Sequence, residues 1–207
     1  MKRVIFYSLF VAVVVWFFFR PQPTVRLGNG VKAPEAPFQV PLTPAMEAGK
    51  SFFAEGYVIT PKAKFELTGK ILSRRTYSFG RQTDLSPIDL ALGWGRMSDE
   101  AVIEHLKIKQ RVRFYFWKTR GSEFPIPARE ITSHSANMHL IPADSAVKKA
   151  ILNTKRGQIV SLRGRLVDVL APKDLWQWKS SMVRDDSGGG ACEVIWVESF
   201  EVVESEG

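Results

Sequence analysis

The chain is poor in cysteine and histidine. It has one cysteine in 207 residues, Cys192, and three histidines. A single thiol excludes a disulfide within the chain and any zinc site that needs two cysteines from one chain. Disulfide-stapled folds and zinc ribbons are therefore ruled out. With 45% hydrophobic and 24% charged residues, the composition is that of a folded globular protein, which also excludes disorder and a collagen-like chain.

Charged residues are missing from one long stretch near the start. Residues 4–19 are almost entirely apolar and follow Lys2 and Arg3. As a helix, this run covers about 24 Å at about 1.5 Å per residue, so it crosses a hydrocarbon core of about 30 Å if Lys2 and Arg20 reach the headgroups. It ends in aromatic residues, whereas a cleavage site needs small ones. We therefore expect residues 1–20 to form a single-pass transmembrane signal-anchor, with a cleaved signal peptide and a buried helix as the alternatives.

The short basic tail ahead of this run predicts the orientation. Secretory machinery reads such a tail as an N-terminal signal, which leaves the N-terminus in the cytoplasm and the rest of the chain on the extracytoplasmic, periplasmic side. Arg20, Arg26 and Lys32 follow the run, so the margin by the positive-inside rule is narrow. Residues 21–49 contain six prolines, a composition that favours extended chain, and we expect a stalk there.

From residue 50 onward the pattern is mostly that of β-strands. Apolar and polar residues alternate over 65–71, 111–117 and 160–166, so each segment has one apolar face. We expect further strands at 54–59, 128–133 and 192–203.

Two of these segments, 65–71 and 160–166, match each other at an offset of 95 residues. Each has a glycine in its middle, Gly69 and Gly164. A mid-strand glycine marks a bend or bulge, as strands that coil round a small barrel require. The match reflects either an internal duplication or simply two curved strands.

Two helices interrupt the strands. We expect Ser98 to cap a helix that has Asp99 and Glu100 in its first turn. We expect Asp144 to cap a second helix, over 146–152, that stops at Gly157. The pattern predicts an α+β, mainly β fold: a small OB-like or related β-barrel domain over residues 50–207 with two short helices, preceded by the transmembrane helix.

A polar segment, residues 133–139, contains two of the three histidines. His134 and His139 are five residues apart, so they lie on opposite faces of a strand and miss the spacing of a shared metal face on a helix. No metal site and no cofactor are expected. The structural alternative for this segment is an irregular connection whose polar side chains satisfy backbone groups.

A second polar segment has a triple glycine ahead of Cys192. Cys192 is a candidate nucleophile if His139 or His134 acts as its base and Asn137 or Asp185 orients the histidine. The alternative is a buried, inert thiol.

Cations and aromatic residues interleave in the strand predicted at 111–117. Its outer face is expected to carry Arg111, Arg113, Tyr115 and Trp117, a set that can stack on planar groups or hold phosphates; a solvated face is the alternative.

Trp94, between two glycines, is either an anchor for a partner or a plug at the barrel end. Loops on a rigid scaffold often carry function, so we expect the two polar segments to meet at one end of the barrel with these further candidate binding residues: His134, Ser180, Ser181, Arg184, Asp185 and Asp186.

The charge balance limits which classes of partner are expected. Without Lys2, Arg3 and Arg20, 26 Lys and Arg residues face 21 Asp and Glu residues, a net charge of +5 that is too small to indicate polyanion binding. The sequence favours a membrane-tethered, non-catalytic binding or accessory domain of the cell envelope, with a protein partner or an anionic ligand. The alternatives are a hydrolase or transferase that uses Cys192, His139 and Asn137, and an OB-like nucleic-acid-binding protein. Nucleic acid is the less favoured partner because the domain is expected outside the cytoplasm.

Overall fold

The computed structural model describes residues 38–41, 50–183 and 192–203. The predicted signal-anchor and most of the predicted stalk lie outside the described residues. None of the described helices is long and apolar enough to cross a bilayer. The described chain is mainly β, as predicted, with a few short helices. Its elements, in chain order, are β1 (Phe38–Pro41), β2 (Phe52–Ala54), β3 (Tyr57–Thr76), α2 (Gln82–Leu85), β4 (Ile88–Gly93), η2 (Gly95–Ser98), α3 (Glu100–Ile103), β5 (Leu106–Arg111), β6 (Phe114–Thr119), α4 (Ala128–Ser133), β7 (Ser135–Pro142), α5 (Ser145–Leu152), β8 (Ile159–Ala171), β9 (Trp176–Lys179) and β10 (Glu193–Val203).

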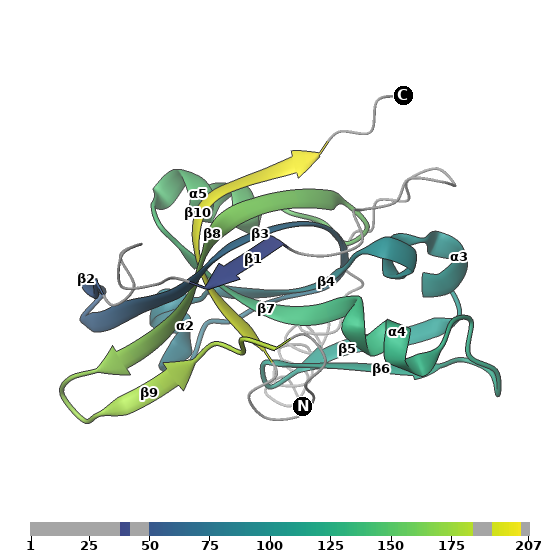
Figure 1. Ribbon diagram of the computed structural model, residues 1–207, viewed down its shortest axis with the longest axis horizontal. Helices are drawn as coiled ribbons and strands as arrows, with labels where there is room; N and C mark the ends of the chain where they lie inside the picture. Colours follow the sequence, from purple (N-terminus) through teal and green to yellow (C-terminus); the bar gives the residue numbers. More distant parts are fainter. Residues whose placement is uncertain (1–37, 42–49, 184–191, 204–207) are drawn as a thin grey trace, which may run out of the picture.

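Five of the strands are paired in a ring. β3 pairs with β4, β4 with β7, β7 with β10, β10 with β8, and β8 again with β3 (Figure 1). The β7–β10 pairing is parallel, whereas the other four are antiparallel. A parallel pair needs a long connection, and α5 and β8 both lie between β7 and β10 in the chain. β1 and β2 extend the ring by pairing with β3, and β9 extends it by pairing with β8.

The ring encloses the main hydrophobic core. Because side chains alternate along a strand, every second residue points inward, as Phe65 and Leu67 of β3 and Met138 and Leu140 of β7 do. Burying each such side chain contributes about 1.5–3 kcal/mol. Helix α5 covers one side of the ring, against β7 and β10 (Figure 1). The predicted cap of this helix is confirmed, because the Asp144 side chain accepts a hydrogen bond from Val147 N at 2.8 Å.

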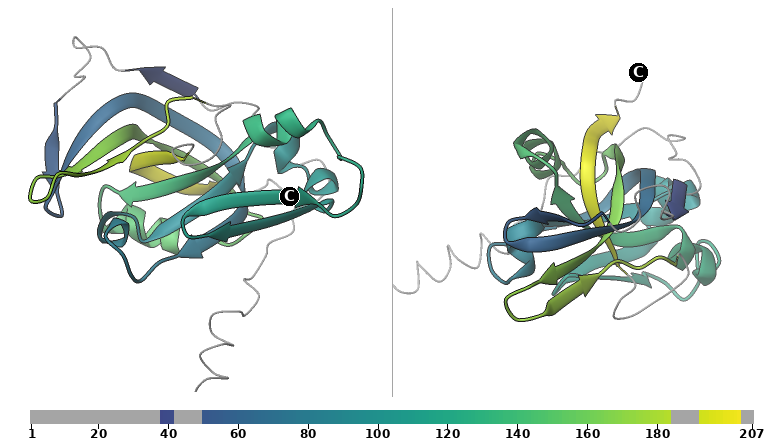
Figure 2. Two further views of the ribbon diagram at one scale, coloured as in Figure 1. Left: turned by 90° about the horizontal axis from the view of Figure 1, so that it is seen from below. Right: turned by 60° about the vertical axis from the view of Figure 1, so that its left-hand side comes forward.

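A second layer covers part of the outer face of the ring. The β5–β6 hairpin lies beside the short helices α3 and α4 (Figure 2). Leu106 of β5 and Ile131 of α4 form a separate core with residues such as Leu72 and Ala91 of the ring. The outward-facing residues of β4 and β7 are therefore buried where this layer covers them.

Gly164 allows two ring strands to approach closely. It lies opposite Val197 in the β8–β10 pairing, and the register of that pairing shifts between Val197 and Ser199. A Cβ atom at Gly164 would lie 2.0 Å from the carbonyl oxygen of Trp196. The irregularity that the mid-strand glycine predicted is therefore present, on the partner strand. The two matching segments are also direct neighbours, with Leu67 opposite Leu162.

The prediction of one continuous strand over residues 111–117 is wrong, because the chain reverses direction there. Val112 and Arg113 both have positive φ, of 49° and 62°, and form the two-residue turn between β5 and β6. Neither residue is glycine or asparagine, so the sequence lacks the usual turn signal. As a result, Tyr115 and Trp117 pack toward the ring, whereas Phe114 and Phe116 are 40% and 54% exposed.

Three other local predictions also need correction. Residues 128–133 form helix α4 and not a strand, because the segment is too short for its pattern to distinguish the two. Residues 135–142 form a buried strand of the ring, whereas the alternative given for residues 133–139 was an irregular connection. The cap of α3 is Asp99, which accepts from Ala101 N at 3.0 Å, whereas the Ser98 hydroxyl donates to Gly95 O.

Substitution of Gly164 tests the close strand approach. We expect Gly164→Ala to lower the free energy of unfolding by about 3 kcal/mol or more, because the added methyl group would overlap the Trp196 carbonyl. Gly121→Ala is the matched control, since a Cβ there has no neighbour within 4 Å. Urea denaturation of the full chain in detergent, followed by circular dichroism, measures both. Equal midpoints for the two variants would contradict the packing described.

Candidate functional site

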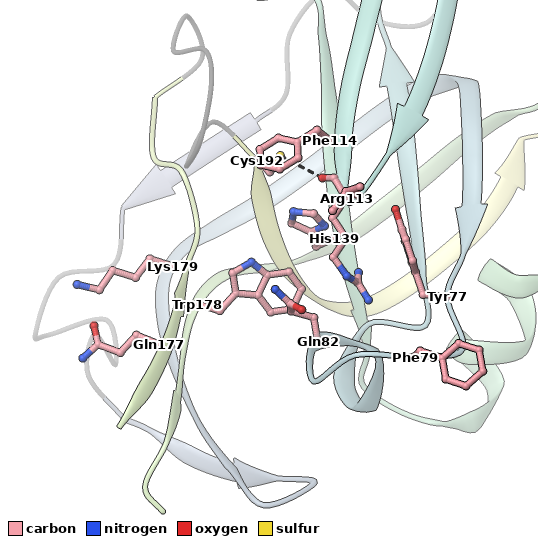
Figure 3. Close-up of a pocket in the computed structure, with 11 residues that line it drawn as sticks. Tyr77, Phe79, Gln82, Arg113, Phe114, His139, Gln177, Trp178, Lys179 and Cys192 are labelled. Atoms are coloured by element: carbon pink, nitrogen blue, oxygen red, sulfur yellow. Dashed lines mark hydrogen bonds between the residues drawn. The ribbon is translucent and has the colours of Figure 1, made fainter. Parts of the chain in front are cut away.

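A pocket of about 720 Å³ lies on the outer side of the ring, where three connections meet. Residues from several parts of the chain line it: the β3–β4 connection with α2, the β5–β6 turn, β9, the middle of β7, and Cys192 just before β10 (Figure 3). The lining residues are Tyr77, Phe79, Gln82, Val112, Arg113, Phe114, His139, Gln177, Trp178, Lys179 and Cys192.

Strand pairing positions the polar residues of this wall. Asp89 of β4 lies directly opposite His139 of β7, and Ala91 lies opposite Asn137. The residues between them, such as Leu90 and Met138, point into the ring core. Asp89, Asn137 and His139 therefore point outward, where residues of the β5–β6 hairpin and β9 contact and bury them.

A buried charged cluster holds the β5–β6 turn to the ring. Asp89 is 0% exposed, and its Oδ1 accepts a hydrogen bond from Arg113 Nη1 at 2.8 Å. His139 Nδ1 lies 2.9 Å from the same oxygen. Arg113 also donates to Ser86 O at 2.9 Å and to the Thr83 hydroxyl at 3.1 Å. A carboxylate without solvent is stable only with such partners, so Asp89 fixes Arg113 and His139 together.

Aromatic rings surround this cluster. The Arg113 guanidinium lies 4.0 Å from the centre of the Tyr77 ring and 5.7 Å from that of Trp178. The rings of His139 and Trp178 lie 4.8 Å apart. Burial and the nearby Asp89 carboxylate raise the pKa of Tyr77 well above its ordinary range, so its phenol stays neutral. The pocket wall therefore alternates ring faces with polar hydrogen-bonding groups.

Two of the three residues predicted to act in catalysis, His139 and Cys192, line the pocket, and the third, Asn137, is buried behind the lining. Asn137 Nδ2 lies 3.8 Å from Cys192 Sγ, and the Cys192 thiol lies 3.9 Å from the Arg113 carbonyl oxygen, a bond drawn in Figure 3. Gln110 holds Asn137 by donating to its Oδ1 at 2.7 Å. His139 lines the same pocket. A catalytic role for these residues stays a prediction.

The partner of His139 was missed at the sequence level. Asn137 and Asp185 were the predicted orienting residues, whereas the structure brings Asp89 to His139 Nδ1. The available signal was a lone acid inside an apolar strand, residues 88–92, because a buried carboxylate there needs a specific partner.

The other predicted binding residues are divided between several places. Trp94 is 2% exposed and belongs to the ring core, so its side chain is buried and is not an exposed anchor. His134 ends helix α4, where its Nδ1 lies 2.9 Å from the Ser133 hydroxyl, away from the pocket lining. Arg111 is exposed on β5.

Tyr115 and Trp117 lie on the inward face of the hairpin. The Tyr115 hydroxyl donates to Ser135 Oγ at 3.1 Å, and burial raises the pKa of this phenol. Trp117 packs edge-on against Phe124. These two aromatic residues attach the hairpin to the ring and are not available to stack on a ligand.

Ser180 and Ser181 secure the start of β10. Val194 N donates to the Ser180 hydroxyl at 3.1 Å, and Ser181 N donates to Cys192 O at 3.0 Å. The two polar segments meet beside the pocket where Asn137 Nδ2 of the first lies 3.8 Å from Cys192 Sγ of the second. Arg184, Asp185 and Asp186 lie outside the described residues.

The lining residues indicate what the pocket can hold. Among the described residues that line it, Arg113 and Lys179 are cationic and none is acidic. Phe79, Val112 and Phe114 provide an apolar rim. In the described chain, no three His, Cys, Asp or Glu side chains gather as a metal site. The arrangement suits an anion that carries an apolar or aromatic group.

Substitution of Asp89 tests the buried cluster. We expect Asp89→Asn to lower the free energy of unfolding by about 3–5 kcal/mol, because it leaves the Arg113 guanidinium buried without a counter-ion. Asp174→Asn is the control: Asp174 forms an exposed ion pair with Arg81, and its loss should change stability little. Thermal unfolding of both full-length variants measures the difference. If the two substitutions cost the same, Asp89 does not hold the cluster together.

The chain matches no protein-family model. It also matches no curated protein and no solved structure.

Proposed function

We propose that this chain is a membrane-tethered, non-catalytic binding domain of the cell envelope, built on an OB-like barrel that takes an anionic ligand in the pocket beside Trp178. The ring order supports the OB-like assignment. In chain order the ring strands are β3, β4, β7, β8 and β10, and the last of them lies between the third and the fourth. The first three strands are neighbours in chain order, whereas β10 lies next to β7 ahead of β8. This order makes a Greek-key arrangement of five strands, as in OB-folds.

The observation that carries the binding function is the position of the pocket. It lies between the connection that joins the first two ring strands and the connection that joins the last two, over the outer face of the second and third. OB-folds bind their ligands at these two loops and on this pair of strands. The fold analogy supports binding in general, whereas the ligand chemistry has to come from the residues.

The residues favour an anion with an apolar part. The Lys179 side chain is exposed at the pocket and has an attractive charge. The Arg113 charge is largely compensated by Asp89, so its contribution is mainly to hold the wall in place. Phe79, Val112 and Phe114 offer exposed apolar contacts at the rim.

Membrane attachment is the part of the proposal that the sequence supports alone. The uncharged run over 4–19 behind a short basic tail favours a signal-anchor with the domain on the periplasmic side.

A hydrolase or transferase is a second candidate. In its favour, Cys192 and His139 both line the pocket, Asn137 Nδ2 lies 3.8 Å from Cys192 Sγ, and Asp89 Oδ1 lies 2.9 Å from His139 Nδ1. A nucleophilic thiol site needs a histidine as base and a group that orients it. Against it, the Cys192 thiol donates to the Arg113 carbonyl oxygen, so it is held within the wall, as a structural thiol is.

Reporter fusions test the membrane attachment. We expect a reporter that is active only outside the cytoplasm to work when fused after Gly207, and a reporter that is active only inside to fail. The fusion protein should sediment with the membrane fraction. Deletion of residues 4–19 is the control and should release the fusion into the soluble fraction. An active cytoplasmic reporter would contradict the orientation and restore nucleic acid as a partner to consider.

Phenyl phosphate, which joins an anion to an aromatic ring, tests the pocket. Phosphate alone and benzyl alcohol alone test the anionic and the aromatic part separately. We expect phenyl phosphate to shift the Trp178 indole resonance at a lower concentration than either of these, because it contacts both Lys179 and the apolar rim. Lys179→Gln should weaken the binding about two- to fivefold, since the lost ion pair is exposed. Lys173→Gln, an exposed lysine in the turn between β8 and β9 that does not line the pocket, should leave the binding unchanged.

Two outcomes would count against the proposed binding function. If benzyl alcohol binds as well as phenyl phosphate, the pocket has no preference for anions. If the chain hydrolyses p-nitrophenyl acetate, and Cys192→Ala removes this activity while phenyl phosphate still binds, the second candidate replaces the first.

A further inference from the structure

The outer face of the β5–β6 hairpin is a second surface with a consistent chemistry. Strand pairing puts Lys107 opposite Lys118, Lys109 opposite Phe116, and Arg111 opposite Phe114, so these six side chains share one face. We call them the hairpin face. All six residues are exposed, whereas the alternate residues of both strands pack toward the ring.

The charges of the hairpin face are all of one sign. Four of its six residues are cationic and none is acidic. Among the described residues, the ion pairs involve other cations, and none includes a cation of the hairpin face. Directly opposed like charges, such as Lys107 and Lys118, repel each other. The surface therefore has an uncompensated positive potential that an anionic partner would neutralise.

The same face exposes large apolar side chains. The rings of Phe114 and Phe116 lie 6.3 Å apart in the middle of the cations, and Val112 at the tip of the hairpin is 71% exposed. Phe79 is exposed as well and lines the pocket together with Val112 and Phe114. Neighbouring exposed apolar residues rimmed by polar ones mark interaction surfaces, including membrane contacts.

We propose that the hairpin face docks on the anionic surface of a phospholipid bilayer, with Phe114 and Phe116 in the headgroup region and the four cations on lipid phosphates. This proposal rests on the membrane attachment proposed above. Aromatic side chains between lysines and arginines suit the bilayer interface, where the rings enter the boundary and the long cationic side chains reach the phosphates. Each Lys or Arg near an anionic membrane strengthens binding about fivefold.

The tether makes a lipid partner the best fit to this face. Residues 20–37, which join the predicted anchor to β1, span at most about 60 Å even when fully extended. A domain held this close to a bilayer meets it at high effective concentration, so a face of modest affinity is sufficient for docking. Nucleic acid could satisfy the same charges, but the proposed location separates it from the domain.

Docking has a consequence for the pocket. Val112, Arg113 and Phe114 belong to the β5–β6 turn and also line the pocket. A docked hairpin face therefore holds the pocket rim at the membrane surface. Ligands that partition into the interface, with an anionic group and an apolar part, would then reach the pocket without crossing bulk water.

Depth-dependent quenching of a fluorescent label tests this docking in the full chain. The protein carries Cys192→Ser with Phe116→Cys or Glu201→Cys, is labelled with an environment-sensitive dye, and is reconstituted in vesicles that contain a headgroup-region quencher. Glu201 is the control position, because it is exposed near the end of β10, which Figure 1 draws far from β5 and β6. The vesicles contain about one part phosphatidylglycerol to two parts phosphatidylcholine, or phosphatidylcholine alone.

We expect quenching at position 116 in the anionic vesicles and little quenching at position 201. Quenching at 116 should fall to the level of 201 in neutral vesicles and in about 1 M salt. Lys107→Gln, Lys109→Gln and Lys118→Gln together should have the same effect. The matched variant changes three other exposed lysines to glutamine, Lys64, Lys149 and Lys173, which removes equal charge and should leave the quenching unchanged.

Flotation of the vesicles separates the two proposals. If the chain does not float with vesicles of either composition, the membrane attachment is wrong. If it floats but position 116 is not quenched, the attachment stands and the docking is overturned. If a single-stranded oligonucleotide binds the chain, and the three hairpin lysine substitutions abolish that binding without changing the quenching, the face serves nucleic acid and the lipid proposal is overturned.

Discussion

The pairing of β3 with β8 is the constraint on which the remaining structure depends. It runs from Val58 opposite Leu170 to Lys70 opposite Ile159, and it joins the first ring strand to the fourth. Without it, the strands would form an open sheet with two exposed edges, and the apolar face inside the ring would lie in water. Two long strands with the same alternating pattern can pair in this way because both bury the same face. Gly164 then lets β10 approach β8 from the other side.

Closure of the ring also decides where polar chemistry can occur. Its interior is filled by aliphatic and aromatic side chains, so the polar residues of β4 and β7 point outward. There, the β5–β6 hairpin and β9 remove them from solvent, and each needs a partner. Asp89 Oδ1 and Arg113 supply such partners to each other, and this pair ties the hairpin to the ring. Scaffold and pocket wall therefore depend on one buried carboxylate.

The long strands and the Asp144 helix cap were easier to predict from sequence than the β5–β6 turn and the pocket residues. The strands around Gly69 and Gly164 and the strand over 192–203 repeat the period of two for long enough to be recognised, and Asp144 is a strong local cap. The hairpin was missed because Val112 and Arg113 adopt positive φ without glycine, a conformation that the surrounding packing imposes. The link between Asp89 and His139 is non-local, 50 positions apart, and only the β4–β7 register creates it.

The two cationic surfaces differ in how their charges are compensated, and this difference separates their roles. In the pocket, the Arg113 side chain is only 12% exposed and is paired with Asp89, so it fixes geometry and adds little attraction for an anion. On the hairpin face, Lys107, Lys109 and Lys118 lie in water, where the Coulomb energy of each is small but all act in the same direction. A flat array of such charges is effective against a partner that is itself an array of charges, whereas a small ligand meets only one or two of them. A bilayer is such a partner, so under the two proposals made above the hairpin face orients the domain at the membrane and the pocket selects a ligand.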